Sequence, residues 1–315
     1  MSSKNMPDDL ILDHSSPSYS NAKMAEEKLL ALFGLKARDK WINNSEEKLR
    51  IRISEIGEGE PAFVIPGNTG DSYPFIPLVS KLEGYHFYLF NRPGGGLSDG
   101  FDHERNDLRE FVINTIDAVF DELGIESISL LSHSMGSHWA LWYAMARPLR
   151  VKKIVVIGNP GRVMLDSAPI PIKILLWPGV DSFAFKFLVS ENRKKDLTGL
   201  KKMGINKSKL DDISQEYKDC IYYFQHLPHY KTASLSLLRA FNKDDRNAIK
   251  EDELGALNVP VQMLWGEKDT FADVDKGREI SRAIPNCQFE LIKDAGHMPW
   301  IDGLDICAEK IKDFL

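Results

Sequence analysis

The stretch Leu130-Leu131-Ser132-His133-Ser134-Met135-Gly136-Ser137 decides how the rest of the chain can be interpreted. The apolar residues 128–131 predict a buried strand, and residues 138–147 predict a helix. Ser134 therefore stands in a tight turn between a strand and a helix, with small residues two positions before and after it. Such a turn can expose a serine hydroxyl at the end of a sheet. The usual pattern has glycine at both flanking positions, whereas Ser132 occupies the first one here.

The composition fits a large α/β protein. The chain has 315 residues, of which 43% are hydrophobic, enough for one large domain with an insertion or for two smaller domains. The net charge of -6 and the lack of a basic tract argue against a nucleic-acid partner. The three cysteines, Cys220, Cys287 and Cys307, lie far apart without metal-ligand spacing, which predicts reduced thiols.

The sequence also predicts neither secretion nor a membrane span. Residues 1–20 lack the apolar core of a signal peptide. Residues 163–189 are rich in apolar side chains, but Asp166, Lys173 and Asp181 interrupt a run that would need roughly 20 apolar residues to cross a bilayer. We therefore expect a soluble, cytoplasmic protein.

The pattern up to residue 160 alternates between strands and helices. The expected strands are residues 49–53, 62–65, 86–90, 128–131 and 154–157, and the expected helices are residues 75–82, 108–123 and 138–147. Asp107 and Glu110 form a capping pair for the second helix, and Gly124 ends it. This alternation predicts a parallel sheet that is covered by helices on both faces.

The whole chain divides into an N-terminal extension, a core and an inserted cap. Residues 1–40 form an N-terminal extension, expected to be disordered to about residue 19 and then helical. Residues 161–257 have little strand signal and predict an inserted helical cap, so the core consists of residues 41–160 and 258–315. The core resumes with strands at residues 261–265 and 289–292 and with helices at residues 274–283 and 304–315.

Two loops, each following one of the last two strands, carry residues that could activate a serine. They are Trp265-Gly266-Glu267-Lys268-Asp269 and Ala295-Gly296-His297-Met298-Pro299. A serine hydroxyl is a weak nucleophile and needs a base, and histidine suits that role because its ordinary pKa is about 6.5. A carboxylate must then orient the imidazole. We predict Ser134, His297 and Asp269 in these roles; Asp294 is an alternative acid, although it is better placed to serve a turn.

These motifs resemble the α/β-hydrolase superfamily, in its capped serine-hydrolase branch, over roughly residues 40–315. The chain order of serine, acid and histidine is that of this fold. The loop Arg92-Pro93-Gly94-Gly95-Gly96-Leu97-Ser98-Asp99 is also similar to the glycine-rich loop after the family's fourth core strand. The resemblance implies an α/β-hydrolase fold: a mostly parallel central sheet, flanking helices and an inserted helical cap.

The resemblance further implies an oxyanion hole made of the backbone N–H groups of Met135 and Asn68. The family usually has His-Gly in the loop before Asn68, whereas this chain has Pro66-Gly67. Asn68 is similar to a halide-binding position of dehalogenase relatives. Those relatives use aspartate as the nucleophile, so Ser134 argues against dehalogenase and epoxide hydrolase chemistry.

Several other residues have simpler interpretations than a place in the site. His133 follows the strand directly but should point away from the nucleophile, toward the surface or a supporting layer. His226 and His229 lack further ligands at metal-binding spacing, so we expect surface residues of the cap and no metal. Helix residues expected in the core are Trp139, Trp142 and Tyr143.

The side chains of the predicted cap indicate what kind of substrate the site could bind. Its apolar residues outnumber what a free surface helix needs, and they include Ile174, Leu175, Leu176, Trp177, Phe183, Phe185 and Phe187. Most of them should pack on the core, and a minority should line an apolar pocket over Ser134. Trp177, Phe185 and Trp300 are the predicted substrate contacts.

These patterns together predict a cofactor-free serine hydrolase. It would act on a small to medium hydrophobic carboxylic ester or lactone through an acyl-enzyme on Ser134. Hydrolysis of a carbon–carbon bond, an amide or a thioester remains open, as does a lyase or an oxygenase that uses the triad as a base. A non-catalytic, receptor-like member also remains open because of Ser132 and Pro66-Gly67. The sequence leaves both monomer and homodimer possible.

Overall fold

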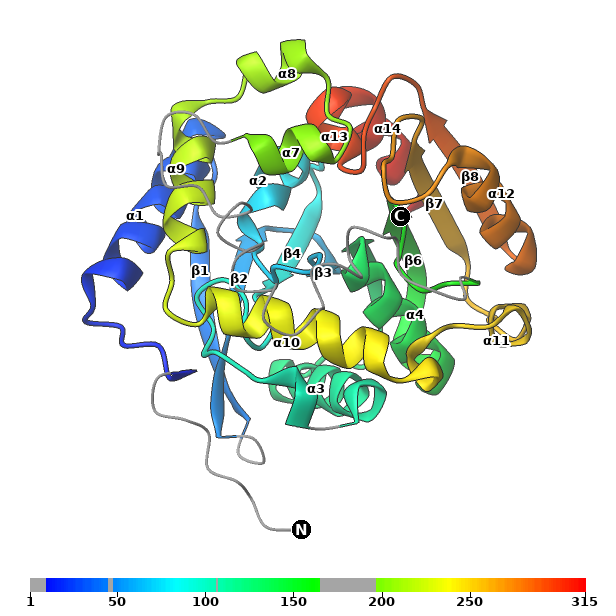
Figure 1. Cartoon of the computed structure of the whole chain (residues 1–315), viewed down its shortest axis with the longest axis horizontal. Coiled ribbons are helices and arrows are strands. Elements are labelled where there is room, and N and C mark those ends of the chain that lie inside the picture. Colours follow the sequence, from blue (N-terminus) through cyan, green and yellow to red (C-terminus); the bar gives the residue numbers. More distant parts are fainter. Residues whose placement is uncertain (1–9, 45–47, 106, 165–196) are drawn as a thin grey trace.

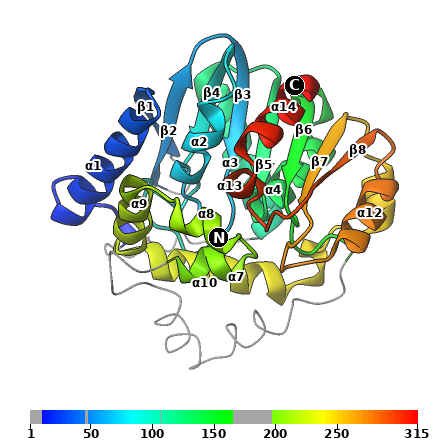
Figure 2. The same cartoon turned by 90° about the horizontal axis from the view of Figure 1, so that it is seen from above.

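An eight-stranded sheet in the order β1-β2-β4-β3-β5-β6-β7-β8 organises the protein (Figure 2). The computed structural model describes residues 10–44, 48–105, 107–164 and 197–315. The strands are β1 Ala37–Asn44, β2 Leu49–Gly57, β3 Glu60–Ile65, β4 Tyr85–Phe90, β5 Ile128–His133, β6 Val151–Ile157, β7 Val261–Gly266 and β8 Cys287–Ile292. β2 pairs antiparallel with both β1 and β4, and every other pairing is parallel. The predicted mostly parallel sheet is thereby confirmed.

Side chains alternate between the two faces of the sheet, so that each face has its own apolar core. On β3, Ala62 and Val64 belong to one core, whereas Phe63 and Ile65 belong to the other. The helices of the first face are α1 Pro17–Leu32, α2 Ile76–Val79, α13 Pro299–Asp302 and α14 Leu304–Phe314. Those of the second are α3 Leu108–Leu123, α4 Met135–Ala146 and α12 Val274–Ala283. The sheet is thus covered on both faces, as the alternation of elements predicts.

The chain between β6 and β7 is helical where it is described. Its helices are α7 Thr198–Lys202, α8 Lys207–Asp211, α9 Gln215–Gln225, α10 Tyr230–Lys243 and α11 Glu251–Gly255. α9 lies beside α1 (Figure 1). Gly204, after α7, lies against the loops that follow β7 and β8, where a Cβ would crowd Lys268 and Gly296. The segment between α7 and α8 therefore covers the loops at the carboxyl ends of β7 and β8, where the Met203 carbonyl also accepts from the His297 N–H at 2.8 Å.

The N-terminal segment corrects one expectation. Disorder to about residue 19 is wrong for residues 10–19, since Leu10 and Leu12 are buried and α1 begins at Pro17. The Leu10 carbonyl accepts from the Gly100 N–H at 2.6 Å, and the Leu12 N–H donates to Asp99 Oδ1 at 3.0 Å. The segment is therefore fixed on the loop after β4.

Other element boundaries agree closely with the sequence pattern. α3 and α12 span the predicted residues, Asp107 accepts from the Glu110 N–H at 3.2 Å, and Gly124 ends α3 in the left-handed conformation. Trp139, Trp142 and Tyr143 are fully buried, as expected. The three cysteines are free thiols. Among the described residues, no helix has the length and apolar character that crossing a bilayer requires.

Candidate active site

Ser134 occupies a strained turn at the carboxyl end of β5, the middle of the sheet. Its φ of 53° and ψ of -128° place a non-glycine residue in a sparsely populated region. Its N–H donates to the Ile157 carbonyl of neighbouring β6 at 3.0 Å, which holds the turn against the sheet. The serine side chain is thereby displayed at the start of α4, as the sequence pattern predicts.

The two small residues that flank Ser134 have different reasons to be small. A Cβ on Gly136 would collide with the carbonyl oxygens of Ile65 and Pro66, so only glycine fits there. Ser132 is fully buried, and its hydroxyl donates to the Val155 carbonyl at 2.8 Å. Serine is tolerated in place of the usual glycine because its polar atom has an acceptor in the next strand.

Asp269 and His297 lie side by side, in the loops after β7 and β8. Asp269 Oδ2 is 2.7 Å from His297 Nδ1, and both side chains are almost completely buried. The carboxylate also accepts from the Asn159 N–H at 3.1 Å and from the Phe271 N–H at 2.9 Å. Burial alone would raise the pKa of Asp269, but the imidazole of His297 and these hydrogen bonds hold the pKa below its usual value. Asp269 therefore remains an anion that can orient His297.

The alternative acid, Asp294, lies elsewhere. Its side chain is 78% exposed and forms an ion pair with Lys268 at 3.0 Å. Its φ of 56° is typical of a turn, the role that its sequence position suggested. The geometry favours Asp269 as the partner of His297.

The His297 ring reaches the same end of the sheet as Ser134. A Cβ on Gly158, the residue after Ile157, would lie 2.9 Å from His297 Nδ1. The ring of His133 lies 4.7 Å from the ring of His297, and His133 directly precedes Ser134. Because Nδ1 is used by Asp269, Nε2 is left as the ring atom that can take a proton from a serine.

Of the two positions expected for His133, the surface or a supporting layer, the structure shows the supporting layer. His133 is buried, and its Nε2 lies 3.1 Å from the His297 carbonyl oxygen. Burial holds the pKa of His133 well below its ordinary value, so the ring is neutral. His133 thus packs against the loop that carries His297.

Trp300 is fully buried next to His133, which it meets edge-on at 5.0 Å. Its indole N–H donates to the Pro74 carbonyl at 2.9 Å, and its ring stacks on Phe75. Trp300 thus packs in the core of the first face. The other predicted substrate contacts, Trp177 and Phe185, lie outside the described residues.

The two predicted oxyanion donors flank Ser134. Met135 is the first residue of α4, so its N–H has no acceptor inside the helix. On the other side, a Cβ on Gly67 would lie 3.4 Å from Ser134 Cβ, which places the Gly67–Asn68 peptide beside the serine. In the described turns and loops, the Asn68 N–H donates to no main-chain oxygen. Among the described residues, neither N–H group therefore has a main-chain acceptor, which is what an oxyanion donor requires.

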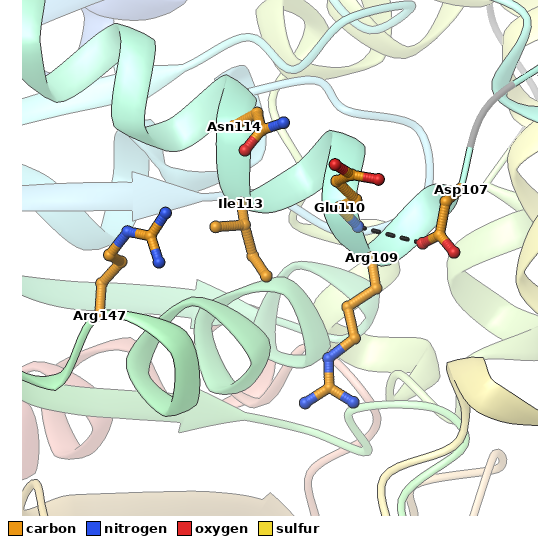
Figure 3. A pocket seen from close by; sticks show the side chains of 6 residues that line it. All are labelled: Asp107, Arg109, Glu110, Ile113, Asn114 and Arg147. Carbon is orange, nitrogen blue, oxygen red and sulfur yellow. Dashed lines mark hydrogen bonds between the residues drawn. The ribbon is translucent and has the colours of Figure 1, made fainter.

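His226, His229 and a surface hollow have no contact with the Asp269–His297 pair among the described interactions. His229 is buried, contrary to the expectation for a cap surface, whereas His226 is exposed. Among the described residues, no three His, Cys, Asp or Glu side chains are grouped as metal ligands. The hollow in Figure 3 is lined by Asp107, Arg109, Glu110, Ile113, Asn114 and Arg147. Its arginines are paired, Arg109 with Glu253 and Arg147 with Asp117.

Comparison with known families agrees with this geometry. Residues 60–304 match the family model of the alpha/beta hydrolase fold. The matched range includes the Ser134 turn, the Asp269 loop and the His297 loop. The chain belongs to the α/β-hydrolase fold family, as its motifs predict.

Relatives in sequence cover nearly the whole chain. A 2-hydroxy-6-oxononadienedioate/2-hydroxy-6-oxononatrienedioate hydrolase from Cupriavidus pinatubonensis is 27% identical over 291 residues, covering 87% of this chain and 93% of the relative. A hydrolase of the same name from Klebsiella pneumoniae is 26% identical over 297 residues, covering 89% and 96%.

Solved structures show the same fold at lower identity. A carboxylesterase from Bacillus subtilis superposes with a TM-score of 0.70 at 17% identity, covering 95% of this chain and 98% of that one. A meta-cleavage product hydrolase from Pseudomonas fluorescens gives a TM-score of 0.71 at 16% identity, covering 87% and 96%. These likenesses concern the fold alone.

Proposed function

We propose that this chain is a serine hydrolase in which Ser134 attacks a carbonyl carbon, His297 acts as the base and Asp269 orients the imidazole. The observation that carries the proposal is the buried 2.7 Å contact between Asp269 and His297, at the same end of the sheet as the strained Ser134 turn. Backbone strain of the kind seen at Ser134 clusters at active sites, which supports a catalytic role for this serine.

The proposed reaction gives each of these groups one role. Ser134 Oγ attacks the carbonyl carbon while His297 Nε2 takes its proton, and Asp269 stabilises the imidazolium that forms. The N–H groups of Met135 and Asn68 hold the negative oxygen of the tetrahedral intermediate. His297 then gives the proton to the leaving group, and a water molecule releases the acyl group from Ser134 by the same steps.

The substrate that we propose first is a small to medium hydrophobic carboxylic ester or lactone. The surroundings of the reacting groups support an apolar substrate: Phe271 lies 4.4 Å from the His297 ring, and Met135 and Met298 are buried nearby. We also propose that residues 161–257 form the cap over this site, since the described segment between α7 and α8 contacts the loops after β7 and β8.

A second candidate is hydrolysis of a carbon–carbon bond beside a ketone. It is favoured by the names of the two sequence relatives, which describe oxo-dicarboxylates without an ester group. Ser134 Oγ would form a bond to the ketone carbon, the adjacent carbon–carbon bond would break, and the departing carbon would take the proton that His297 received from Ser134.

The test compares the two substrate classes on one preparation of the full chain. p-Nitrophenyl butyrate and a 6-oxo-dienedioate are supplied separately, and the products are identified by mass spectrometry in ¹⁸O-labelled water. The proposal expects higher kcat/KM on the ester, with one labelled oxygen in the acid. Faster cleavage of the ketone would replace the first candidate by the second. No turnover of either substrate, with no covalent labelling of Ser134, would contradict a serine hydrolase and favour a binding protein.

A further inference from the structure

The glycine-rich loop at residues 91–99 is held tightly against the loop at residues 66–72, which carries Asn68. The Gly96 N–H donates to Asp71 Oδ1 at 2.9 Å, and Asn91 Nδ2 donates to Ser72 Oγ at 2.9 Å. The backbones approach so closely that a Cβ on Gly95 would collide with Gly70. The first loop is therefore a rigid support for the second.

Arg92 provides the charged contact between the two loops. Its side chain is 1% exposed, and its Nη2 donates to the Gly67 carbonyl oxygen. Its guanidinium also lies over the Trp139 ring, 4.4 Å from the ring centroid. Nε and Nη1 have no hydrogen-bond partner within the part of the chain that the structure describes. The buried cation thus has one hydrogen-bond acceptor there, and that acceptor is a backbone oxygen.

The Gly67 carbonyl oxygen is important because it belongs to the same peptide unit as the Asn68 N–H. The Gly67 C=O and the Asn68 N–H form one planar, trans peptide unit, so they point in opposite directions. The Gly67 carbonyl also accepts from the Gly70 N–H at 2.9 Å. Fixing this oxygen on both Arg92 and Gly70 fixes the direction of the Asn68 N–H.

We infer that Arg92 is a positioning residue for the oxyanion hole, which holds and polarises the Gly67–Asn68 peptide so that the Asn68 N–H faces the developing oxyanion. This inference rests on the proposed function of Ser134. Arg92 acts through the peptide and does not touch the substrate.

The charge of Arg92 is preserved in its site. Burial lowers the pKa of Arg92 to about 9, against a weaker attraction from Asp71, and the side chain stays a cation at neutral pH. A hydrogen bond from a cation is stronger than one from a neutral donor, and the water-poor surroundings strengthen it further. By drawing electron density toward the Gly67 oxygen, the cation makes the Asn68 N–H a better donor.

Arg162 offers a control for a buried arginine that acts away from Ser134, where it donates to backbone carbonyls and pairs with the exposed Asp245 carboxylate at 2.7 Å. It is also buried, and its Nη1 donates to the carbonyls of Phe241 and Asp244, each at 3.0 Å. These carbonyls lie at the end of α10 and belong to neither loop beside Ser134. Loss of Arg162 removes a comparable buried cation without changing the Gly67–Asn68 peptide.

The test measures three variants of the full chain: Arg92→Met, Arg92→Lys and Arg162→Met. Readouts are kcat and KM on p-nitrophenyl butyrate, normalised to folded protein, and the inhibition constant of a trifluoromethyl ketone that forms an oxyanion on Ser134. Since loss of a direct oxyanion donor lowers kcat by about 10²- to 10³-fold, we expect about 10- to 100-fold for Arg92→Met. The inhibitor should weaken by a similar factor while KM changes less than about threefold, and Arg92→Lys should recover part of the loss.

Each result of these measurements either supports or overturns the role of Arg92. Unchanged kcat and inhibitor binding in Arg92→Met, or equal losses in Arg162→Met, would overturn it. If Arg92→Met does not fold, Arg92→Gln, which also removes the charge but keeps a polar side chain, takes its place, and a kcat and an inhibitor affinity equal to those of the wild type would overturn the inference. Lack of any turnover and of inhibitor binding in the wild type would instead contradict the proposed function itself.

Discussion

The regions around Arg52 and Arg92 accommodate a buried cation in opposite ways. Arg52, on β2, has no exposed surface; its Nη2 lies 2.5 Å from Glu26 Oε2 and 2.7 Å from Asp39 Oδ1. Burial disfavours its charge, but these carboxylates outweigh burial and raise the pKa of Arg52. Arg92 has only the Gly67 carbonyl as a described acceptor, and burial lowers its pKa. Among the described residues, carboxylates hydrogen-bond to Arg52, whereas none hydrogen-bonds to Arg92, on which Asp71 acts only by its charge.

The two regions contribute differently: the Arg52 cluster stabilises the fold, and the Ser134 region carries the proposed reaction. Glu26 lies on α1 and Asp39 on β1, so the Arg52 cluster holds the N-terminal helix to the antiparallel edge of the sheet. The Ser134 region contains a strained backbone and a buried carboxylate next to a histidine, features that cost stability and suit a reaction. Substitutions in the first region should change unfolding, and those in the second should change turnover.

The largest expected effect is that of Asp269→Asn. Without the carboxylate, His297 loses its orientation and the partner of its imidazolium, so kcat should fall by about 10³- to 10⁴-fold. Asp294→Asn is the matched control; because Asp294 is exposed and paired with Lys268, its kcat should stay within about twofold. Steady-state kinetics on p-nitrophenyl butyrate measures both. A larger loss in Asp294→Asn would reverse the assignment of the acid.

The next effect is on stability. Arg52→Met leaves Glu26 and Asp39 without their buried partner, which should lower the free energy of unfolding by about 3–5 kcal/mol. Urea unfolding measures the change, and kcat per folded molecule should remain that of the wild type. Lys152→Met, which removes an exposed pair with Glu60, should change the free energy by less than about 1 kcal/mol. A loss of kcat in Arg52→Met would contradict the view that the Arg52 cluster contributes to stability and not to the reaction at Ser134.

The smallest effect depends on pH. Burial lowers the pKa of His229 to about 4, whereas a histidine in the unfolded chain titrates near 6.5. Between these values only the unfolded chain binds the proton, so this contribution to stability is complete above about pH 6.5 and is lost as the pH falls toward 4. Urea unfolding of His229→Gln and wild type should differ by about 1–2 kcal/mol less at pH 5 than at pH 7. A difference that is constant with pH would contradict a neutral, buried His229.

The sequence predicts most of the fold because buried elements have strong patterns. β3, β5, β7, α3 and α12 were all expected close to where they lie. β1 was missed because Ala37–Asn44 is a polar edge strand without regular alternation. The helix expected at residues 75–82 is reduced to Ile76–Val79, which follows a short 3₁₀ turn over Tyr73–Phe75. Pro74 and Pro77 restrict the chain there.

The sequence predicts the functional site only in part, as it does the fold. Asp269 and His297 were predicted from loop motifs, and the structure brings them together. The sequence left a surface and a supporting position open for His133 and predicted the wrong one for His229, since burial depends on tertiary neighbours that a local pattern does not contain. The contact of Arg92 with Gly67 joins residues that are 25 positions apart, so only the folded chain reveals it.

The most direct test of this account is the covalent labelling of Ser134. A fluorophosphonate probe is added to the wild type and to Ser134→Ala, and intact mass is followed by peptide mapping. We predict one equivalent of label on the wild type, located at Ser134, and none on the variant, which should fold as stably as the wild type. An unlabelled wild type, or equal labelling of the variant, would contradict the claim that Ser134 is the activated nucleophile.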